Sequence, residues 1–338
     1  MPPDEFVIDA RELVRDFGKA RAVDGVSFAV AAGEVFGFLG PNGAGKTTTV
    51  RMLTTLLEPT SGRVVIGGFD VDHQPYQARR LIGLVPEEAN IYTELSAWDN
   101  LMFSARLYRV PGDLRDGRAT ELLRTFGLHE KRHIKAQLYS KGMRRRLSIA
   151  MALIHEPAIL FLDEPTSGLD VQSALAIKQI VRELNARGTT VFLTTHQIEE
   201  ANQLCDRVAI INADRLAAVD SPERLKQTMT SVQAVEVAFS GGGPRMESVL
   251  RRLPGVTDVA KHGDKWRLYT PDPPALMPLL FDLAGQWELQ VVSLNTLGPS
   301  LEDVFLRLTG QKVGPSAGGN GPGTTGAGKP GRGELRDV

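Results

Sequence analysis

A glycine-rich segment with the sequence GPNGAGKT lies between an apolar stretch and a predicted helix. It matches the phosphate-binding loop pattern G-x-x-x-x-G-K-(S/T), in the strand–loop–helix setting that the pattern requires. Glycines let backbone N–H groups converge on phosphate oxygens, and the helix N-terminus adds partial positive charge. We expect Lys46 to reach the β- and γ-phosphates of a nucleoside triphosphate, and the Thr47 hydroxyl to ligate Mg²⁺. The candidate nucleotide contacts in this loop are Gly40, Pro41, Asn42, Gly43, Ala44, Gly45, Lys46, Thr47 and Thr48.

A second candidate lies where the apolar run AILFL ends in two carboxylates, Asp163 and Glu164. Burying carboxylates is unfavourable unless they meet a cation or a reacting group. We therefore expect Asp163 to bind Mg²⁺ and Glu164 to polarise the water that attacks the γ-phosphate. Taken alone, the segment could be an acidic strand end facing solvent. Together with the phosphate loop, it predicts a nucleoside triphosphatase.

Three shorter motifs narrow the class of protein. YSKGMRRRL precedes the acidic strand, SGLD follows it, and TTH ends the next predicted strand. In this order, over about residues 5–228, the set resembles the nucleotide-binding subunits of ABC transporters. The resemblance places Ser140 and Gly142 in the LSGGQ signature, Asp170 in the D-loop, His196 as the switch histidine and Phe17 as the aromatic that stacks on adenine. Taken singly, Ser140 could be a plain helix N-cap, His196 a strand-end histidine and Phe17 a core residue.

The family resemblance also implies that ATP, with Mg²⁺, is held between the phosphate loop of one subunit and Ser140 of a second copy. Two departures from the family pattern stand out. Lys141 and Met143 replace a glycine and a glutamine of the signature, and Glu87 stands where the family usually has the Q-loop glutamine. A carboxylate there could still approach Mg²⁺ or its water, so Glu87 is a candidate nucleotide and metal contact. Its negative charge would weaken ATP binding unless compensated, and its role is left open.

These residues need a scaffold, and the alternation of short apolar strands with helical stretches over residues 5–228 predicts an α/β core. The expected fold is a P-loop NTPase of the ABC ATPase type, with an antiparallel β portion and an inserted helical subdomain at about 96–154. Residues 232–309 show a β-α-β-β-α-β order and then a last helix, which predicts a small ferredoxin-like α+β domain. The tail 311–338 is rich in Gly and Pro, so we expect it to be disordered.

Three features have plain structural interpretations. The first is an apolar stripe at helical spacing, which is more typical of subdomain core than of a groove for a coupling helix from a membrane subunit. The Arg144–Arg146 run is expected to be a solvated helix face, with salt bridges to a partner as the alternative, and Cys205 an inert packing residue. The stripe consists of Trp98, Leu101, Met102 and Ala105.

Composition excludes other classes. Lys plus Arg number 39 against 40 Asp plus Glu, so the net charge of −1 gives no bulk argument for nucleic-acid binding. A single cysteine excludes an internal disulfide and suits a reducing compartment. The chain lacks an uninterrupted apolar run long enough to span a bilayer and lacks a secretory pattern at its start. Together with these exclusions, the family resemblance implies a peripheral protein on the cytoplasmic face of the membrane, bound to a separate permease and to a second copy of itself, with no nucleic acid.

The C-terminal segment LGPSLEDVFLRLT resembles the accessory domain of ABC-2-type, daunorubicin-resistance-like ATPases. This implies export of a drug, an antibiotic or a lipid-like compound, although the domain could instead stabilise a dimer or regulate it. One alternative function is a soluble ABC-type ATPase that acts on ribosomes or DNA, but the chain has neither two cassettes nor a long coiled coil. Another is a nucleotide sensor without hydrolysis, against which the intact Lys46, Asp163 and Glu164 argue.

Overall fold

The computed structural model describes residues 6–88, 90–228, 233–241 and 245–310. The predicted disordered tail, 311–338, lies outside these ranges. The N-terminal sheet has the strand order β2-β1-β4-β5, with every neighbouring pair antiparallel, as the sequence predicted. Its strands are β1 (Phe6–Phe17), β2 (Ala20–Ala31), β4 (Ser61–Ile66) and β5 (Phe69–Asp70).

A six-stranded sheet forms the centre of the molecule, in the order β10-β9-β3-β8-β7-β6. Neighbours from β9 to β6 are parallel, and only β10 pairs antiparallel. Strands β3, β7 and β8 are buried along their whole length, as expected of parallel strands covered on both faces. The strands are β3 (Val35–Leu39), β6 (Ile82–Val85), β7 (Ile159–Asp163), β8 (Thr190–Thr195), β9 (Arg207–Asn212) and β10 (Arg215–Asp220).

Two apolar cores cover the faces of this sheet. One lies between the two sheets and contains five aromatic rings, in which Phe192 contacts the other four, those of Phe28, Phe36, Phe38 and Phe161. The other joins the sheet to the helices of the opposite face. Because β3, β7 and β8 are adjacent and parallel, the segments that follow their carboxyl ends meet at one edge, where ligands bind in open α/β sheets.

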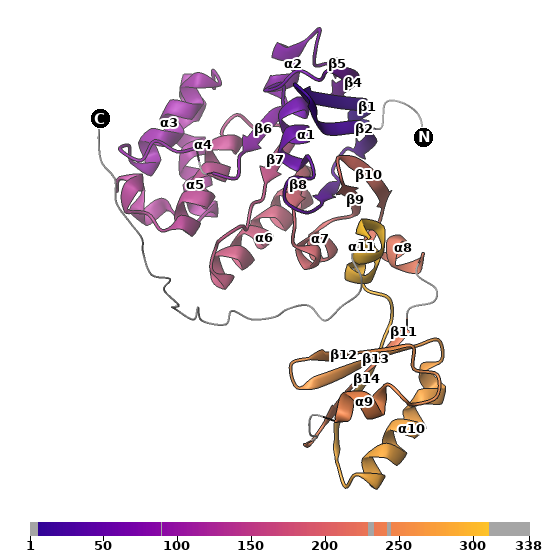
Figure 1. The fold of residues 1–338 in the computed structure, drawn as a ribbon. Coiled ribbons are helices and arrows are strands. Elements are labelled where there is room, and N and C mark those ends of the chain that lie inside the picture. The colour runs from indigo at the N-terminus through magenta and orange to yellow at the C-terminus, as the bar shows by residue number, and fades with distance from the viewer. Residues whose placement is uncertain (1–5, 89, 229–232, 242–244, 311–338) are drawn as a thin grey trace, which may run out of the picture.

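The helices divide between this core and a helical subdomain, α3, α4 and α5, which lies to one side in Figure 1. In the expected apolar stripe, Leu101 and Ala105 are fully buried, and Trp98 and Met102 pack against the same cluster. The stripe is therefore core of the subdomain. The helices are α1 (Lys46–Leu53), α2 (Pro75–Arg80), α3 (Ala97–Leu107), α4 (Gly112–Thr125), α5 (Lys141–Leu153), α6 (Val171–Ala186), α7 (Ile198–Leu204) and α8 (Pro222–Gln227), with 3-10 turns at His129–Lys131 and Ala136–Leu138.

The C-terminal sheet has the order β12-β13-β11-β14 and is antiparallel throughout, which is the ferredoxin-like arrangement that the element order predicted. Helices α9 and α10 supply its core through Met246, Leu250, Leu276 and Leu280. In Figure 1 this unit lies apart from the central sheet. Its elements are β11 (Gln233–Phe239), α9 (Met246–Leu250), β12 (Asp258–His262), β13 (Lys265–Thr270), α10 (Pro273–Gln286) and β14 (Val291–Leu297).

The last helix, α11 (Leu301–Thr309), packs on α7 and α8 rather than on the C-terminal sheet (Figure 1). Its apolar side chains Leu301, Val304 and Phe305 belong to the core of the nucleotide-binding part. A capping box between Ser300 and Asp303 starts the helix. The sequence grouped this helix with the accessory range 232–309. Its spatial placement differs because α9 and α10 already supply the helical core of that sheet, and the apolar side of α11 is covered elsewhere.

In the described ranges, no helix combines the length and the apolar character needed to cross a membrane.

Candidate active site

The glycine-rich segment after β3 curves around the side chain of Lys46. Lys46 Nζ donates to the carbonyl oxygens of Gly40 at 2.8 Å and Pro41 at 3.2 Å, and the side chain is almost fully buried. Gly45 precedes α1 with φ +92°, and a Cβ on it would lie 2.4 Å from the carbonyl oxygen of Ala22. A side chain is therefore excluded at Gly45 both by the left-handed backbone and by the neighbouring strand.

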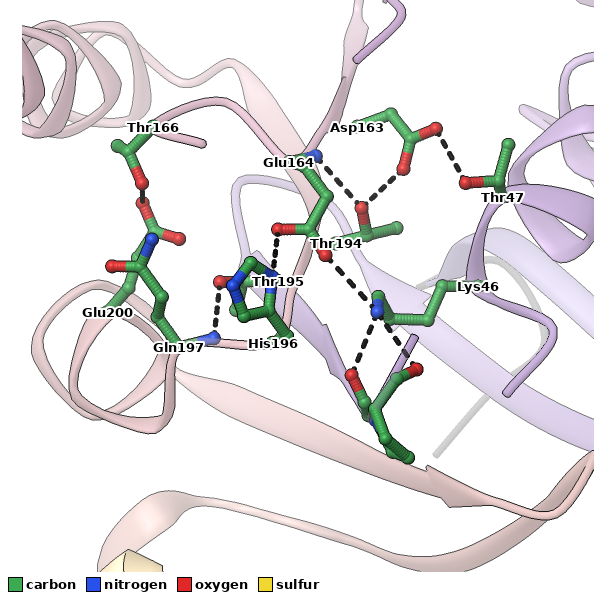
Figure 2. Close-up of polar contacts among 12 residues, drawn as sticks. Lys46, Thr47, Asp163, Glu164, Thr166, Thr194, Thr195, His196, Gln197 and Glu200 are labelled. Carbon is green, nitrogen blue, oxygen red and sulfur yellow. Dashed lines mark hydrogen bonds and ion pairs between the residues drawn. The ribbon is translucent and has the colours of Figure 1, made fainter. Parts of the chain in front are cut away.

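Asp163, at the end of β7, is buried and hydrogen-bonded on both carboxylate oxygens. Thr47 Oγ1 donates to Oδ2 at 2.9 Å, and Thr194 Oγ1 donates to Oδ1 at 2.5 Å (Figure 2). Two of the three candidate Mg²⁺ ligands, Thr47 and Asp163, are thus in direct contact. Thr194 was missed as a site residue, although it belongs to the TTH motif that the sequence singled out.

Glu164 lies at the centre of the site, and its side chain is buried between two basic groups. Its Oε1 is 3.2 Å from Lys46 Nζ, in an ion contact that is not aligned as a hydrogen bond, and its Oε2 is 2.8 Å from His196 Nδ1 (Figure 2). The Glu164 N–H donates to Thr194 Oγ1 at 3.0 Å. Its φ is +47°, a left-handed conformation of the kind that concentrates at functional sites. Of the three residues predicted to be catalytic, Lys46 and His196 therefore both contact Glu164.

His196 follows β8, and its side chain is 42% exposed. A carboxylate oxygen can only accept, so the short contact with Glu164 assigns the proton to Nδ1. Nε2 is then the ring nitrogen left for a second partner. The histidine is therefore tied to the catalytic carboxylate on one side and open on the other.

A cavity of about 350 Å³ lies over these groups. Glu87 lines it together with the phosphate loop, and its side chain is exposed. The structure thus brings Glu87 to the place that the family pattern assigns to the Q-loop. The described residues lining the cavity are Ala22, Asn42, Gly43, Gly45, Lys46, Thr47, Thr48, Glu87, Glu164, Ser167 and His196.

Phe17 ends strand β1, and its ring is 49% exposed, so the core interpretation is wrong. The Arg15 guanidinium lies over one face of the ring, 4.7 Å from its centroid. Phe17 and Ala22 belong to the same β1–β2 hairpin, and the Ala22 carbonyl is the one that approaches Gly45. The aromatic ring is therefore exposed on the hairpin that approaches the phosphate loop, and Phe17 is not among the described residues that line the cavity.

Ser140, Gly142 and Asp170 are not among the described residues that line the cavity. Ser140 Oγ caps α5 by accepting from Met143 N at 3.2 Å, as its plainer interpretation expected. Asp170 caps α6 and accepts from both the N–H and the hydroxyl of Ser173, which lowers the pKa of its carboxyl. A Cβ on Gly142 would lie 2.2 Å from Ser173 Oγ. The signature and the D-loop are therefore packed against each other.

The prediction that Arg144–Arg146 form a solvated face is wrong. Arg145 is 3% exposed and donates to the carbonyl oxygens of Pro86, Glu87 and Glu164. Arg144 and Arg146 also donate to backbone carbonyls. Carbonyls in irregular segments need donors, and a run of arginines carries no local signal of which donor turns inward. Cys205, in contrast, is buried as expected, and burial raises the pKa of its thiol well above the usual range.

The comparisons with known proteins agree with this geometry. Residues 23–167 match the ABC transporter family. The chain is 40% identical over 92% of its length to the daunorubicin resistance ATP-binding protein DrrA2 of Streptomyces coeruleorubidus, of which 97% is covered. It is 35% identical over 91% of its length to the linearmycin resistance ATP-binding protein LnrL of Bacillus subtilis and 38% identical over 91% to a Nod factor export ATP-binding protein of a Rhizobium species, each covered to 99%.

Two solved structures are also similar. CbiO1 of Clostridium perfringens, part of an ABC transporter complex, has a TM-score of 0.61 and 26% identity, covering 67% of this chain and 95% of that one. A dimeric ATP-binding cassette in a post-hydrolysis state with ADP and Pi has a TM-score of 0.58 and 28% identity, covering 63% and 98%. The chain therefore belongs to the ATP-binding, ATP-hydrolysing subunits of the ABC transporter family.

Proposed function

We propose that this protein is the ATPase subunit that powers a separate membrane permease in the export of a drug, an antibiotic or a lipid-like compound. The observation that carries the ATPase part is the contact of Glu164 with both Lys46 and His196 in one buried cluster. The similarity to drug resistance and Nod factor export ATP-binding proteins over nine-tenths of the chain supports the export part.

In the proposed mechanism, Lys46 turns from its loop carbonyls to the β- and γ-phosphates of ATP, whose charge it neutralises. Glu164 orients the attacking water and takes up its proton, while His196 holds the carboxylate through Nδ1 and presents Nε2 to the γ-phosphate. The φ of +47° at Glu164 supports this role, because residues held in such unusual backbone conformations concentrate at functional sites.

The hydroxyl of Thr47 and the carboxylate of Asp163 are hard oxygen donors, and such donors fit Mg²⁺. Among the described residues, no cluster of three or more His, Cys, Asp or Glu could hold a metal by itself. This agrees with an ion that takes its remaining ligands from phosphates and water, as Mg²⁺ commonly does. When bound, the ion would neutralise the charge that develops on the phosphate oxygens, and Glu87 stands close enough to the loop to influence it.

Ser140, Gly142 and Asp170 would act on ATP held by a second copy of the chain. None of the three is among the described residues that line the chain's own cavity, which supports this arrangement, as does the similarity to a dimeric cassette. Phe17 would supply the platform for adenine, since its ring is exposed on the hairpin whose Ala22 approaches the phosphate loop. A protein of this kind would lie on the cytoplasmic face of the membrane, held there by its permease.

The experiment that tests the proposal is purification from detergent-solubilised membranes, followed by identification of the co-purifying proteins. A multi-helix membrane protein should accompany the wild-type chain, and reconstitution of both should stimulate ATP hydrolysis. The Glu164→Gln variant should still bind the partner but should not support transport. Recovery of the chain with ribosomes or DNA, and without any multi-helix protein, would favour the alternative function.

A further inference from the structure

Three consecutive arginines near the start of α5 reach two different parts of the molecule. Arg144 donates to the carbonyls of Ala136 and Gln137, and Arg146 donates to that of Phe126. All three acceptors belong to the same helical subdomain as the arginines. Only Arg145 leaves the subdomain and enters the nucleotide-binding core, where it is 3% exposed.

The Arg145 guanidinium joins two segments that are distant in sequence. Its NH1 donates to Pro86 O at 2.6 Å, and its NH2 donates to the carbonyls of Glu87 and, at 3.3 Å, Glu164. The first two carbonyls follow β6 and the third follows β7. Burial lowers the pKa of Arg145, while the negative charges of Asp163 and Glu87 act in the opposite direction. Arginine stays charged over any pH at which the protein is folded, so the link persists.

Glu164 is held from both sides of its peptide backbone. Its N–H is bound by Thr194, on the neighbouring strand, and its carbonyl accepts from Arg145 and from Ser167 N at 3.2 Å. With φ at +47°, the residue keeps its unusual conformation only because these contacts determine it. A shift of the guanidinium would therefore change the direction in which the carboxylate points.

Helix α5 begins at Lys141, directly after its cap Ser140. Any displacement of that end of α5 moves Arg145, one turn further along the same rigid helix. Arg145 therefore moves together with the signature segment at the start of α5, and it also contacts the backbone carbonyl of Glu164.

We propose that Arg145 is a positioning residue that couples the placement of helix α5 to the orientation of Glu164 and of the Glu87 segment. The proposal rests on the proposed role of Glu164 in hydrolysis. It distinguishes Arg145 from its two neighbours, which fasten α5 only to its own subdomain. A purely structural Arg145 would satisfy carbonyls without affecting catalysis more than Arg144 or Arg146 does.

The test compares Arg145→Met with Arg144→Met and Arg146→Met, which remove the same charge from the same helix. Thermal stability, MgATP affinity and the values of kcat and KM are measured for each. Arg145→Met should lower kcat roughly 10- to 100-fold, the loss expected when a reacting group is misplaced. MgATP affinity should stay within about threefold, and Arg145→Lys should recover part of kcat. Equal kcat losses in all three methionine variants would overturn the proposal.

A double-mutant cycle with Glu164→Gln separates coupling from general damage. If Arg145 acts through Glu164, Arg145→Met should change the residual hydrolysis of Glu164→Gln by no more than about twofold. The same fold-loss in both backgrounds would refute coupling. Near wild-type hydrolysis by Glu164→Gln alone would instead refute the proposed function. If Arg145→Met unfolds below the assay temperature, the Lys variant is carried through the same cycle, with the same outcomes.

Discussion

Glu164 Oε1 lies 3.2 Å from Lys46 Nζ, so the cation expected on the phosphates and the carboxylate expected on the attacking water meet in one buried contact. This pairing keeps both charges compensated inside the protein. ATP would compete for the lysine, and the carboxylate would then face the γ-phosphate with His196 as its remaining partner. In the proposed mechanism, the contact would therefore link nucleotide binding to the release of Glu164 as the base.

Glu164→Gln should reduce ATP hydrolysis by roughly 10²- to 10⁴-fold, the usual contribution of a general base. Gln keeps the shape and can still accept from His196, but it cannot take up a proton. ATP binding should survive, since Lys46, Thr47 and the loop are unchanged. The uncleaved ATP should hold two subunits together, so size exclusion should show a dimer with MgATP and a monomer with MgADP. A variant that hydrolyses at the wild-type rate and remains a monomer would contradict both the base and the dimer.

Glu87→Gln should preserve hydrolysis and strengthen MgATP binding, because it removes a negative charge from the cavity that receives phosphates. Glu302→Gln is the control, since Glu302 is also exposed and lies in α11, outside the described lining of that cavity and of the neighbouring cavity that Thr47 and Asp163 line. Isothermal titration with MgATP should show tighter binding for the first variant only. A large loss of hydrolysis in Glu87→Gln would mean that the carboxylate has a positive role, such as metal ligation.

The phosphate loop and the acidic strand end could be predicted from the sequence, because each consists of consecutive residues. The glycines before Lys46 and the carboxylates after the apolar run specify their strand–loop settings, and the sheet order then brings β3, β7 and β8 together. The exposed ring of Phe17 could not be predicted from its own residue type, since an aromatic at a strand end is more often buried. Only its place in the family pattern, as the aromatic that stacks on adenine, indicated that the ring would be exposed.

What the sequence could not show depends on packing between segments far apart in the chain. From the sequence, the Arg144–Arg146 run predicts a uniformly solvated face. In the structure, α5 is rotated about its axis so that Arg145 points inward, toward the segment that contains Pro86. The apolar positions of α11 predict that one face of the helix is buried, but they do not predict that this face packs on α7 and α8. Both cases reflect tertiary contacts that leave no signal in local periodicity.

Glu200, in α7, is almost fully buried, and Thr166 Oγ1 donates to its Oε1 at 2.8 Å (Figure 2). Burial raises the pKa of its carboxyl, and the nearby charge of Glu164 acts in the same direction. Hydrogen bonds from Thr195 and Thr166 and the charge of Lys178 act against it. An acid with a raised pKa in the folded state binds more protons when folded. Its contribution to stability is therefore complete below its unfolded pKa of about 4.3 and is lost as pH rises through the folded value.

Glu200→Gln should remove this pH dependence while keeping an acceptor for Thr166. The free energy of unfolding of the variant relative to wild type should therefore increase as pH rises above about 4.3, when measured by denaturant titration at several pH values. Glu199→Gln, on the exposed side of the same helix, is the control and should follow the wild type. A constant difference between Glu200→Gln and wild type across this range would show that Glu200 keeps an ordinary pKa.

The arrangement of the signature segment across a dimer can be tested with two inactive variants. Ser140→Arg should impair hydrolysis without weakening ATP binding to the monomer, because Ser140 would contact nucleotide on the other subunit. The substitution also removes an N-cap, which stabilises a helix by about 1 kcal/mol. Ser221→Arg is the matched control, since Ser221 caps α8 in the same manner. It should lose similar stability and keep full hydrolysis.

Lys46→Ala should abolish tight MgATP binding at its own phosphate loop. In a heterodimer with Ser140→Arg, one composite site has an intact Lys46 and an intact Ser140, while the other lacks both. Random mixing of the two variants should therefore restore at most roughly a quarter of wild-type hydrolysis, above the sum of the separate variants. If Ser140 acted on nucleotide in its own chain, each subunit would stay inactive, and mixing would add nothing. Full wild-type activity in the mixture would also contradict the composite site, because half of the sites in each heterodimer lack both groups.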